Sequence, residues 1–318
     1  MLNEISIEIL QRCPNRCIYC SSHSNPQATN IIPYHTIKSV IDDAKFLGCK
    51  TVCLSGGEPF LHPRILDIVN YIAKNQMECY VYTSGIYMRG EEYSALPVEY
   101  IEAIRGMVTK VIFNVEADTP ELYDLIMGTD FGGFELMKKA ISACVSCGLN
   151  VETHIVPMKS NYTHLESIFG MCYKLGVNKV SVLRLVLQGR ALENISLVKM
   201  SIEENKQVRQ CITTLGNKYQ NKIRMGLPYS DCSCRIYCKA ATDKINIRYD
   251  GNVYPCEVFK DDILNKILGC QPDNVLEDSF YNIYQNSHYL STVRENIEAF
   301  KKTDSDEACY GQFKMKRL

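Results

Sequence analysis

The chain has 318 residues, of which 46% are apolar, and a formal net charge of −1. This suits one large domain, or one domain with a smaller second one, built around a substantial core. Lys and Arg form no long run, which argues against a nucleic-acid groove or docking on an anionic membrane. The N-terminus lacks the basic leader of a secretory signal, and no uncharged apolar run reaches the roughly 18 residues of a membrane span. We therefore expect a cytoplasmic protein, whose 16 Cys serve as metal ligands or core residues rather than in disulfides.

Short strand-like segments alternate with longer amphipathic segments up to Arg190. The spacing of Ile37, Val40, Ile41 and Ala44 places them on one face of a helix over about 34–47. The same reasoning predicts further helices near 65–72, 91–105, 121–147 and 162–175, and strands at 5–10, 51–54, 79–82, 111–115, 151–156 and 180–185. Six strand–helix units in succession predict an α/β fold with a parallel sheet.

Three cysteines, Cys13, Cys17 and Cys20, follow the first predicted strand, with three and two residues between them. Thiols at this spacing can converge on one metal centre. A cubane of four irons and four sulfides normally takes four Cys thiolates, so a loop with three leaves one iron open to another ligand. His23 follows Cys20 with two residues between them, so a structural Cys3His zinc site is the alternative.

The second predicted strand ends in Ser55-Gly56-Gly57-Glu58-Pro59. Together with the Cys loop, in which Tyr19 precedes the last Cys, this stretch resembles the radical S-adenosylmethionine (SAM) superfamily. The resemblance implies that SAM chelates the open iron through its methionine amine and carboxylate. One electron from the cluster then yields a 5′-deoxyadenosyl radical, which removes a substrate hydrogen.

The residue types of the Gly-Gly-Glu-Pro stretch fit that role. Gly56 and Gly57 lack Cβ atoms, so the backbone can approach a ligand closely. Glu58 can accept hydrogen bonds from an ammonium, and Pro59 stiffens the turn. The resemblance implies that this stretch holds the methionine amino group of SAM.

Polar residues also stand at or after the ends of the later strands, namely Ser84, Asn114, Glu116, His154 and Arg184. In a barrel or an open α/β sheet, the carboxyl ends of the strands form the edge that binds ligands. We expect these residues to line the cofactor site, with Arg184 pairing with the SAM carboxylate. The alternatives are a surface ion pair for Arg184 and a satisfied polar residue beneath the edge for His154. Ser84, Asn114 and Glu116 stand where the family usually has Asn, Ser and Asp.

The alternation stops after Arg190. A helix is predicted over 201–218, and Asp250-Gly251 between two alternating runs predicts a hairpin flanked by Cys238 and Cys256. The spacing from Cys238 through Gly251 to Cys256 resembles the opening of the SPASM and Twitch auxiliary-cluster domains. We expect domains at 1–195 and 225–318, joined by a linker at 196–224.

One auxiliary [4Fe-4S] cluster is predicted in the C-terminal domain, with Cys232, Cys238, Cys256 and Cys309 as ligands. Cys234, Cys270 or an open iron could replace one of them. A zinc ribbon-like site and a Cys-rich linker that binds nothing are the competing interpretations. Because Cys309 alone follows Cys270, a second auxiliary cluster is not expected.

The resemblance thus implies a partial (βα)6 TIM-like barrel with a small α+β iron–sulfur domain of Twitch or truncated SPASM type. We favour a radical SAM enzyme that modifies a ribosomally made peptide, because 20 Tyr can line a groove and an auxiliary domain can cover an open barrel. A dehydrogenase or epimerase of a small molecule such as an aminoglycoside is the first alternative, with Cys234 as a candidate hydrogen donor. A non-enzymatic zinc protein is the second. Expected partners are an electron donor such as flavodoxin or ferredoxin and a discrete peptide-carrier protein.

Overall fold

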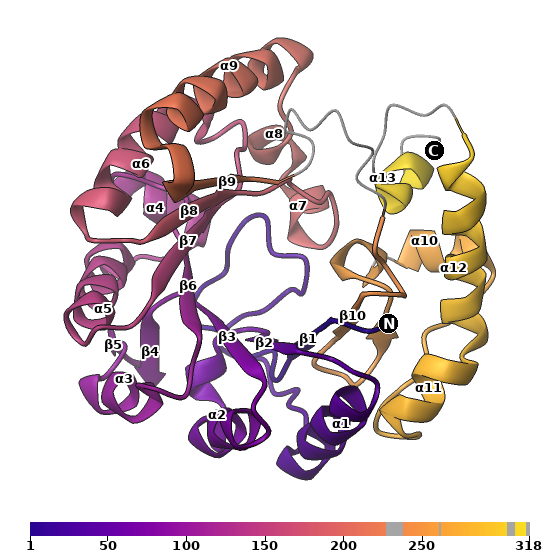
Figure 1. The fold of residues 1–318 in the computed structure, drawn as a ribbon. Helices are drawn as coiled ribbons and strands as arrows, with labels where there is room; N and C mark the ends of the chain where they lie inside the picture. The colour runs from indigo at the N-terminus through magenta and orange to yellow at the C-terminus, as the bar shows by residue number, and fades with distance from the viewer. Residues whose placement is uncertain (227–237, 261, 304–308, 316–318) are drawn as a thin grey trace.

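The computed structural model describes residues 1–226, 238–260, 262–303 and 309–315. Within these ranges the main sheet has nine strands in the order β11-β10-β1-β2-β3-β6-β7-β8-β9. The sheet curves, and most of the helices lie along its outer side (Figure 1). The strands are β1 (Glu4–Glu8), β2 (Thr51–Ser55), β3 (Glu78–Thr83), β6 (Lys110–Asn114), β7 (Val151–Ile155), β8 (Lys179–Val182), β9 (Ile223–Met225), β10 (Lys244–Ile247) and β11 (Val253–Tyr254).

The six predicted parallel strands are confirmed as β1, β2, β3, β6, β7 and β8. Each pairs in parallel with the next, in chain order. Because parallel neighbours share one direction, the segments that follow them all emerge at one edge of the sheet. The short strand β9 continues the sheet in parallel beyond β8.

The helices bury the apolar stripes from which they were predicted; α1, for example, buries Ile37, Val40 and Ile41. Their bounds are α1 (Tyr34–Phe46), α2 (Ile65–Lys74), α3 (Val98–Ile104), α4 (Pro120–Met127), α5 (Gly133–Ser146), α6 (Leu165–Lys174), α7 (Arg190–Glu193), α8 (Ile195–Val198) and α9 (Ile202–Tyr219), followed by α10 (Asp262–Leu268), α11 (Phe280–Asn286), α12 (His288–Lys301) and α13 (Tyr310–Met315). Short 3-10 turns are η1 (Pro59–Leu61), η2 (Tyr162–His164), η3 (Gln220–Lys222) and η4 (Glu257–Lys260).

Two helix predictions need correction. The segment 91–105 is not one helix, because its first residues belong to a hairpin of β4 (Ile86–Arg89) and β5 (Glu92–Ala95), and only α3 is helical. The segment 121–147 forms two helices, since Gly128 and Gly132 both adopt positive φ angles, 63° and 75°, which a helix cannot accommodate.

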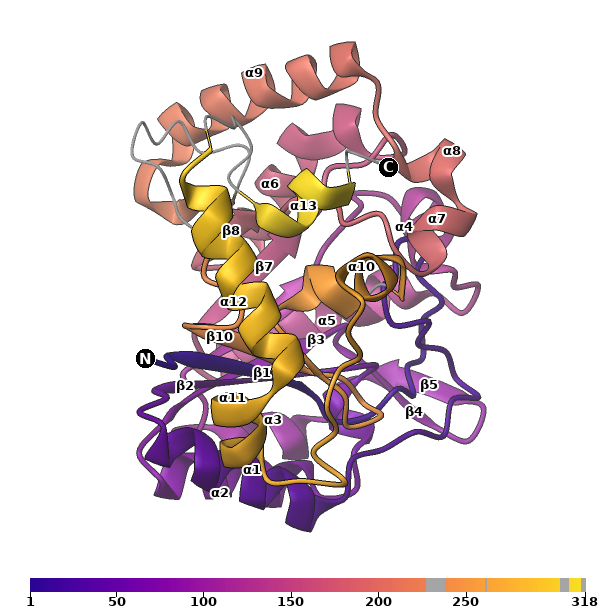
Figure 2. The same cartoon turned by 90° about the vertical axis from the view of Figure 1, so that its right-hand side faces the viewer.

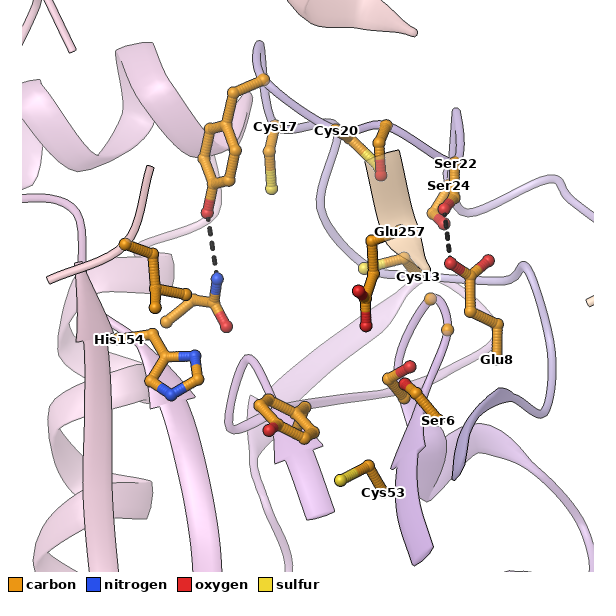
Figure 3. A pocket seen from close by; sticks show the side chains of 18 of the residues that line it. Ser6, Glu8, Cys13, Cys17, Cys20, Ser22, Ser24, Cys53, His154 and Glu257 are labelled. Carbon is orange, nitrogen blue, oxygen red and sulfur yellow. Dashed lines mark hydrogen bonds between the residues drawn. The ribbon is translucent and has the colours of Figure 1, made fainter. Parts of the chain in front are cut away.

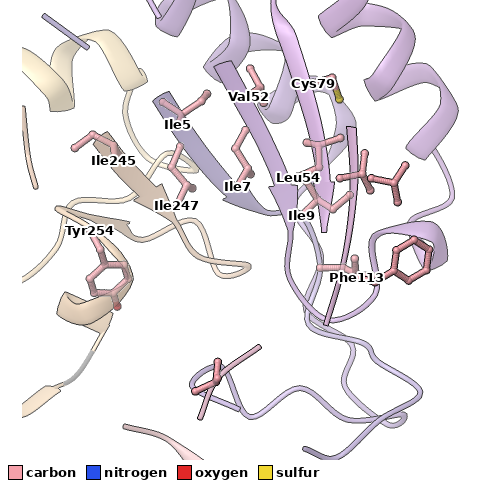
Figure 4. Packing of buried hydrophobic residues seen from close by; sticks show 14 of the residues in the cluster. Ile5, Ile7, Ile9, Val52, Leu54, Cys79, Phe113, Ile245, Ile247 and Tyr254 are labelled. Carbon is pink, nitrogen blue, oxygen red and sulfur yellow. The ribbon is translucent and has the colours of Figure 1, made fainter. Parts of the chain in front are cut away.

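The C-terminal hairpin joins the barrel sheet. β10 pairs in parallel with β1, and β11 pairs antiparallel with β10, so the predicted hairpin is confirmed. Figure 4 shows Ile245 and Ile247 of β10 beside Ile5 and Ile7 of β1. The sheet therefore runs without interruption between the two predicted domains.

Helix α12 lies in front of β1 and β10 when the molecule is viewed from this side, and α11 lies over α1 (Figure 2). The backbone N–H of Tyr281 donates to Asp43 Oδ2 at 3.0 Å, and the rings of Phe46 and Tyr281 are 5.5 Å apart. These contacts attach the C-terminal helices to α1. Among the described helices, none has the length and apolar character needed to cross a membrane.

Candidate functional site

The carboxyl ends of the parallel strands surround a cavity of about 690 Å³. The three cysteines of the first loop point toward it, and His154 lies on the opposite side (Figure 3). Most of the predicted site residues line this cavity, namely Cys13, Cys17, Tyr19, Cys20, Gly56, Gly57, Ser84, Asn114, His154 and Arg184. Glu58, Pro59 and Glu116 are buried but are not among its lining residues.

The Cys loop is held through its backbone. The N–H groups of Arg16 and Ile18 donate to the carbonyls of Met127 and Ile126 at the end of α4, both at 2.9 Å. From the other side, Arg190 donates through Nε to the Cys17 carbonyl at 2.9 Å and through Nη2 to the Ser24 carbonyl at 2.7 Å. Because these bonds use backbone atoms, the thiols stay available to the cavity. Arg190 was not among the predicted site residues.

The loop after β1 leaves no room for a side chain at the two glycines of the second loop, which follows β2. Gly57 N–H donates to the Leu10 carbonyl at 2.7 Å. A Cβ on Gly57 would lie 2.0 Å from the carbonyl oxygen of Arg12, and one on Gly56 would lie 2.3 Å from that of Leu10. In the structure, the two glycines allow a close approach to the backbone that leads into Cys13. Their close approach to a ligand stays a prediction.

Glu58 connects the loop after β2 to the loop after β3 through hydrogen bonds. Its Oε1 accepts from Thr83 Oγ1 at 2.7 Å and from Phe60 N–H at 3.3 Å, while its Oε2 accepts from the Ser84 N–H at 2.8 Å and Oγ at 2.6 Å. Burial raises the pKa of Glu58, although these hydrogen bonds oppose the shift. In this arrangement the carboxylate holds Thr83 and Ser84 in place, and its predicted contact with an ammonium stays a prediction.

Tyr19 is anchored to the end of β6. Its hydroxyl donates to Glu116 Oε1 at 3.1 Å and accepts from Asn114 Nδ2 at 3.3 Å. Glu116 Oε2 also accepts from the Val156 N–H at 2.8 Å. Asn114 therefore faces the cavity, and Glu116 supports the aromatic residue of the Cys loop from behind.

Burial shifts the pKa of two titratable groups near the carboxyl ends of β6 and β7. It raises the pKa of Glu116 to about 8 and lowers the pKa of His154 to about 3. His154 is therefore neutral at neutral pH, and its ring centroid lies 5.3 Å from that of Tyr82. A neutral imidazole can donate and accept hydrogen bonds at the floor of the cavity.

The raised pKa of Glu116 predicts a pH dependence of stability. Between its ordinary value of 4.5 and about 8, the folded chain keeps a proton that the unfolded chain loses, so stability falls as pH rises through this window. In Glu116→Gln this contribution should vanish. Urea unfolding of the metal-free protein at both ends of the window measures it, and an equal pH dependence in parent and variant would contradict the assignment.

The polar atoms that line the cavity without a hydrogen-bond partner, together with the thiols, fit a polar, cationic group. Asn15 Oδ1 and Nδ2, Ser24 Oγ and Glu8 Oε2 are buried, belong to lining residues and have no hydrogen-bond partner among the described atoms, whereas buried polar atoms normally have one. Burial raises the pKa of Cys13 and Cys17 well above that of a free thiol. A bound cation would stabilise their thiolates.

His23 does not complete a zinc site with the three thiols. Its half-exposed ring places Nδ1 at 3.6 Å from Glu193 Oε1, and it is not among the lining residues of the cavity. Over the described ranges, no three His, Cys, Asp or Glu side chains converge on a position for a single metal ion. In a cubane each thiolate binds a different iron, so the thiols surround a volume instead of a point.

Three of the predicted auxiliary ligands lie near one another. Burial raises the pKa of Cys256, and the nearby Glu257, Cys309 and Cys238 raise it further. The predicted ligands Cys232 and Cys234 lie outside the described residues. Cys270, the other alternative, is buried, and its Sγ contacts the Leu268 carbonyl at 3.3 Å and Thr292 Oγ1 at 3.7 Å.

A wall of the cavity comes from the C-terminal region and was not predicted. Lys244 Nζ lies 3.0 Å from Glu4 Oε1 and 3.2 Å from Glu257 Oε1. Figure 3 shows the Glu257 carboxylate directed into the cavity. Burial acts to raise the pKa of Glu257. Attraction to Lys244 and Lys260, together with hydrogen bonds from Lys244 and the backbone, outweighs burial, so the pKa lies below its ordinary value. Asn246, two residues after Lys244 on the same strand, is 1% exposed, and both of its amide atoms lack a partner among the described residues.

Comparison with protein families gives two matches. The radical SAM superfamily matches residues 7–172, and the SPASM iron–sulfur cluster-binding domain matches residues 238–311. The first range contains the Cys loop and the strands from β2 to β7. The second contains Cys238, Cys256 and Cys309.

Among curated proteins, the chain is similar to the antilisterial bacteriocin subtilosin biosynthesis protein AlbA of Bacillus subtilis, with 24% identity over 88% of this chain and 58% of AlbA. It is also similar to the PqqA peptide cyclase of Ruegeria pomeroyi, with 24% identity over 92% of this chain and 79% of that protein. The chain therefore spans little more than half of AlbA.

Among solved structures, the fold is similar to Streptococcus suis SuiB bound to the precursor peptide SuiA. The TM-score is 0.72 at 15% identity, over 92% of this chain and 67% of SuiB. It is also similar to anSMEcpe with bound AdoMet, with a TM-score of 0.68 at 13% identity over 96% of this chain and 86% of that chain. At these identities the likeness concerns the fold.

Proposed function

Because the chain belongs to the radical SAM superfamily, we propose that it modifies a ribosomally made peptide by removing a hydrogen atom from it. A [4Fe-4S] cluster with SAM, and an auxiliary iron–sulfur cluster, are the cofactors of this domain combination. The SAM-binding cluster supplies a 5′-deoxyadenosyl radical when both are bound. A flavodoxin or ferredoxin would deliver the electron.

The residues of this chain would hold the cofactors in place. Cys13, Cys17 and Cys20 would bind three irons, and the backbone of Gly56 and Gly57 faces the same cavity. The other lining residues Ser84, Asn114, His154 and Arg184 would supply hydrogen bonds and charge for the remainder of SAM. The walls of the cavity would limit the access of water that would otherwise quench the reaction.

The substrate proposal rests on the chemistry of the C-terminal wall of the cavity. Lys244, Asn246 and Glu257 face the cavity and belong to none of the loops that resemble SAM-binding motifs. Charged and amide groups on this wall suit the polar backbone and side chains of a peptide. The names of AlbA and PqqA peptide cyclase, and the precursor peptide in the SuiB structure, support the same substrate class.

The test supplies the reduced, iron-loaded protein with SAM and the short peptides encoded beside its gene. We expect one peptide to accelerate 5′-deoxyadenosine formation and to change in mass. If the peptides have no effect and a small polar molecule accelerates it, the enzyme acts on small molecules and the peptide proposal is wrong. Counting the electrons consumed per product then separates oxidation from epimerisation, and adding a candidate carrier protein shows whether the peptide needs one.

A variant of the wall gives a further prediction. Glu257→Gln removes the charge that faces the substrate, so peptide product should fall by about tenfold or more, while slow SAM cleavage without peptide should continue. Mass spectrometry of the peptide and chromatography of 5′-deoxyadenosine measure the two rates. Glu277→Gln, at an exposed position, is the control. Equal product from Glu257→Gln and the parent would remove Glu257 from substrate binding.

A further inference from the structure

Lys260 crosses from the C-terminal region to the Cys loop. Its Nζ donates to Glu8 Oε1 at 2.5 Å, Ser21 Oγ at 3.0 Å and Ser22 Oγ at 2.9 Å. The side chains of Lys260 and Glu8 are only 4% and 5% exposed. Ser21 and Ser22 directly follow Cys20, so the ammonium binds the end of the loop that carries the third thiol.

The three contacts use all three donors of the ammonium. Ser22 Oγ also donates to Glu8 Oε1 at 2.9 Å, which closes a small network between β1 and the Cys loop. A buried ammonium is tolerated where a carboxylate and further acceptors compensate for its lost hydration. The network therefore needs a cationic side chain long enough to contact Glu8, Ser21 and Ser22 at once. Removing the cation leaves the Glu8 carboxylate buried and uncompensated.

The same turn that carries Lys260 carries the auxiliary ligand Cys256. Residues 257–260 form η4, directly after Cys256. Gln188 Nε2 donates to the Glu257 carbonyl at 2.6 Å, two residues before Arg190, which binds the carbonyls of Cys17 and Ser24. Side-chain contacts at both ends of η4 thus connect the auxiliary-cluster segment to the first loop.

We propose that Lys260 is a positioning residue that couples the auxiliary-cluster turn to the SAM-binding cluster, by fixing the segment from Cys20 to Ser22. This inference rests on the proposed radical SAM function of the Cys loop. Groups outside the ligand set that orient ligands typically change metal affinity or activity by about 10- to 100-fold when removed. Lys260 acts in this way across the two parts of the chain, so the first cluster depends on a residue of the C-terminal region.

The test uses the full-length, iron-loaded protein. In Lys260→Met, SAM should bind about 10- to 100-fold more weakly, and the change that SAM causes in the electron paramagnetic resonance spectrum of the reduced protein should be altered. That change reports the open iron alone, because a fully ligated auxiliary cluster cannot take SAM. Lys266→Met, at an exposed position on α10, should behave as the parent.

A double variant separates positioning from simple stability. Glu8→Gln with Lys260→Met removes both buried charges, so thermal stability should recover toward the parent, while the altered spectrum and weak SAM binding should remain. Recovery of all three would mean that Lys260 serves only stability, and a Lys260→Met spectrum identical to the parent's would also overturn the coupling. A parent protein whose spectrum does not respond to SAM would instead refute the proposed function, and the coupling with it.

Discussion

Cys17→Ala is expected to abolish 5′-deoxyadenosine formation. The substitution removes one of three thiols that face the cavity, and a cluster with two protein thiolates and an exposed edge is lost to solvent or oxidation. Iron should fall from about eight to about four atoms per chain, since each cubane holds four irons. Chromatography of the SAM products and iron analysis after anaerobic purification measure both effects.

Cys211→Ala is the matched control, because Cys211 is a partly buried thiol on α9. It should keep both the iron and the activity. A Cys17→Ala protein that formed 5′-deoxyadenosine at the parent rate would remove the Cys loop from the mechanism. A parent that carried about two zinc and no iron would instead support the structural zinc interpretation.

Gly57→Ala is expected to have the largest effect on folding. The new methyl group would lie 2.0 Å from the Arg12 carbonyl oxygen. The backbone of residue 57 fixes the Cβ position, and the oxygen belongs to the Arg12 backbone, so no side-chain rotation can relieve the clash. We expect a loss of roughly 3 kcal/mol or more in the free energy of unfolding, in the upper range for single substitutions, together with poor loading of the first cluster. Denaturant unfolding and iron content measure the two.

Gly170→Ala is the corresponding control. Gly170 lies within α6, and a Cβ there would meet nothing within 4 Å, so Ala should stabilise the helix by up to about 1 kcal/mol. If Gly57→Ala unfolded as Gly170→Ala does, the contact between the first and second loops would not be required for the fold.

The parts of the site that could be predicted from sequence are those encoded over short distances. The Cys spacing and the Gly-Gly-Glu-Pro stretch are local, and both loops lie where strand periodicity predicts, at the carboxyl ends of β1 and β2. The failures in the fold are local as well. The break at Gly128 and Gly132 had a visible signal, since two glycines flanked it, and the apolar periodicity of residues 121–147 outweighed that signal.

The contacts that hold the loops could not be predicted in the same way. Lys260 and Glu8 are separated by 252 positions in the chain, and no periodicity relates them. The pairing of β10 with β1 could not be predicted for the same reason, because nothing in a hairpin sequence specifies which distant strand it will join. The alternation of Lys244 and Asn246 with Ile245 and Ile247 did indicate one polar and one apolar face. It did not indicate that the polar face lines the site.

SAM is expected to bind an iron left open by the three thiols of the first loop. Pulsed electron paramagnetic resonance of the reduced protein with SAM labelled by nitrogen-15 at its amino group tests this most directly. We expect a hyperfine coupling between the label and the cluster spin, and we expect it to be lost in the Cys17→Ala protein. An iron-loaded protein in which the label shows no coupling would contradict it.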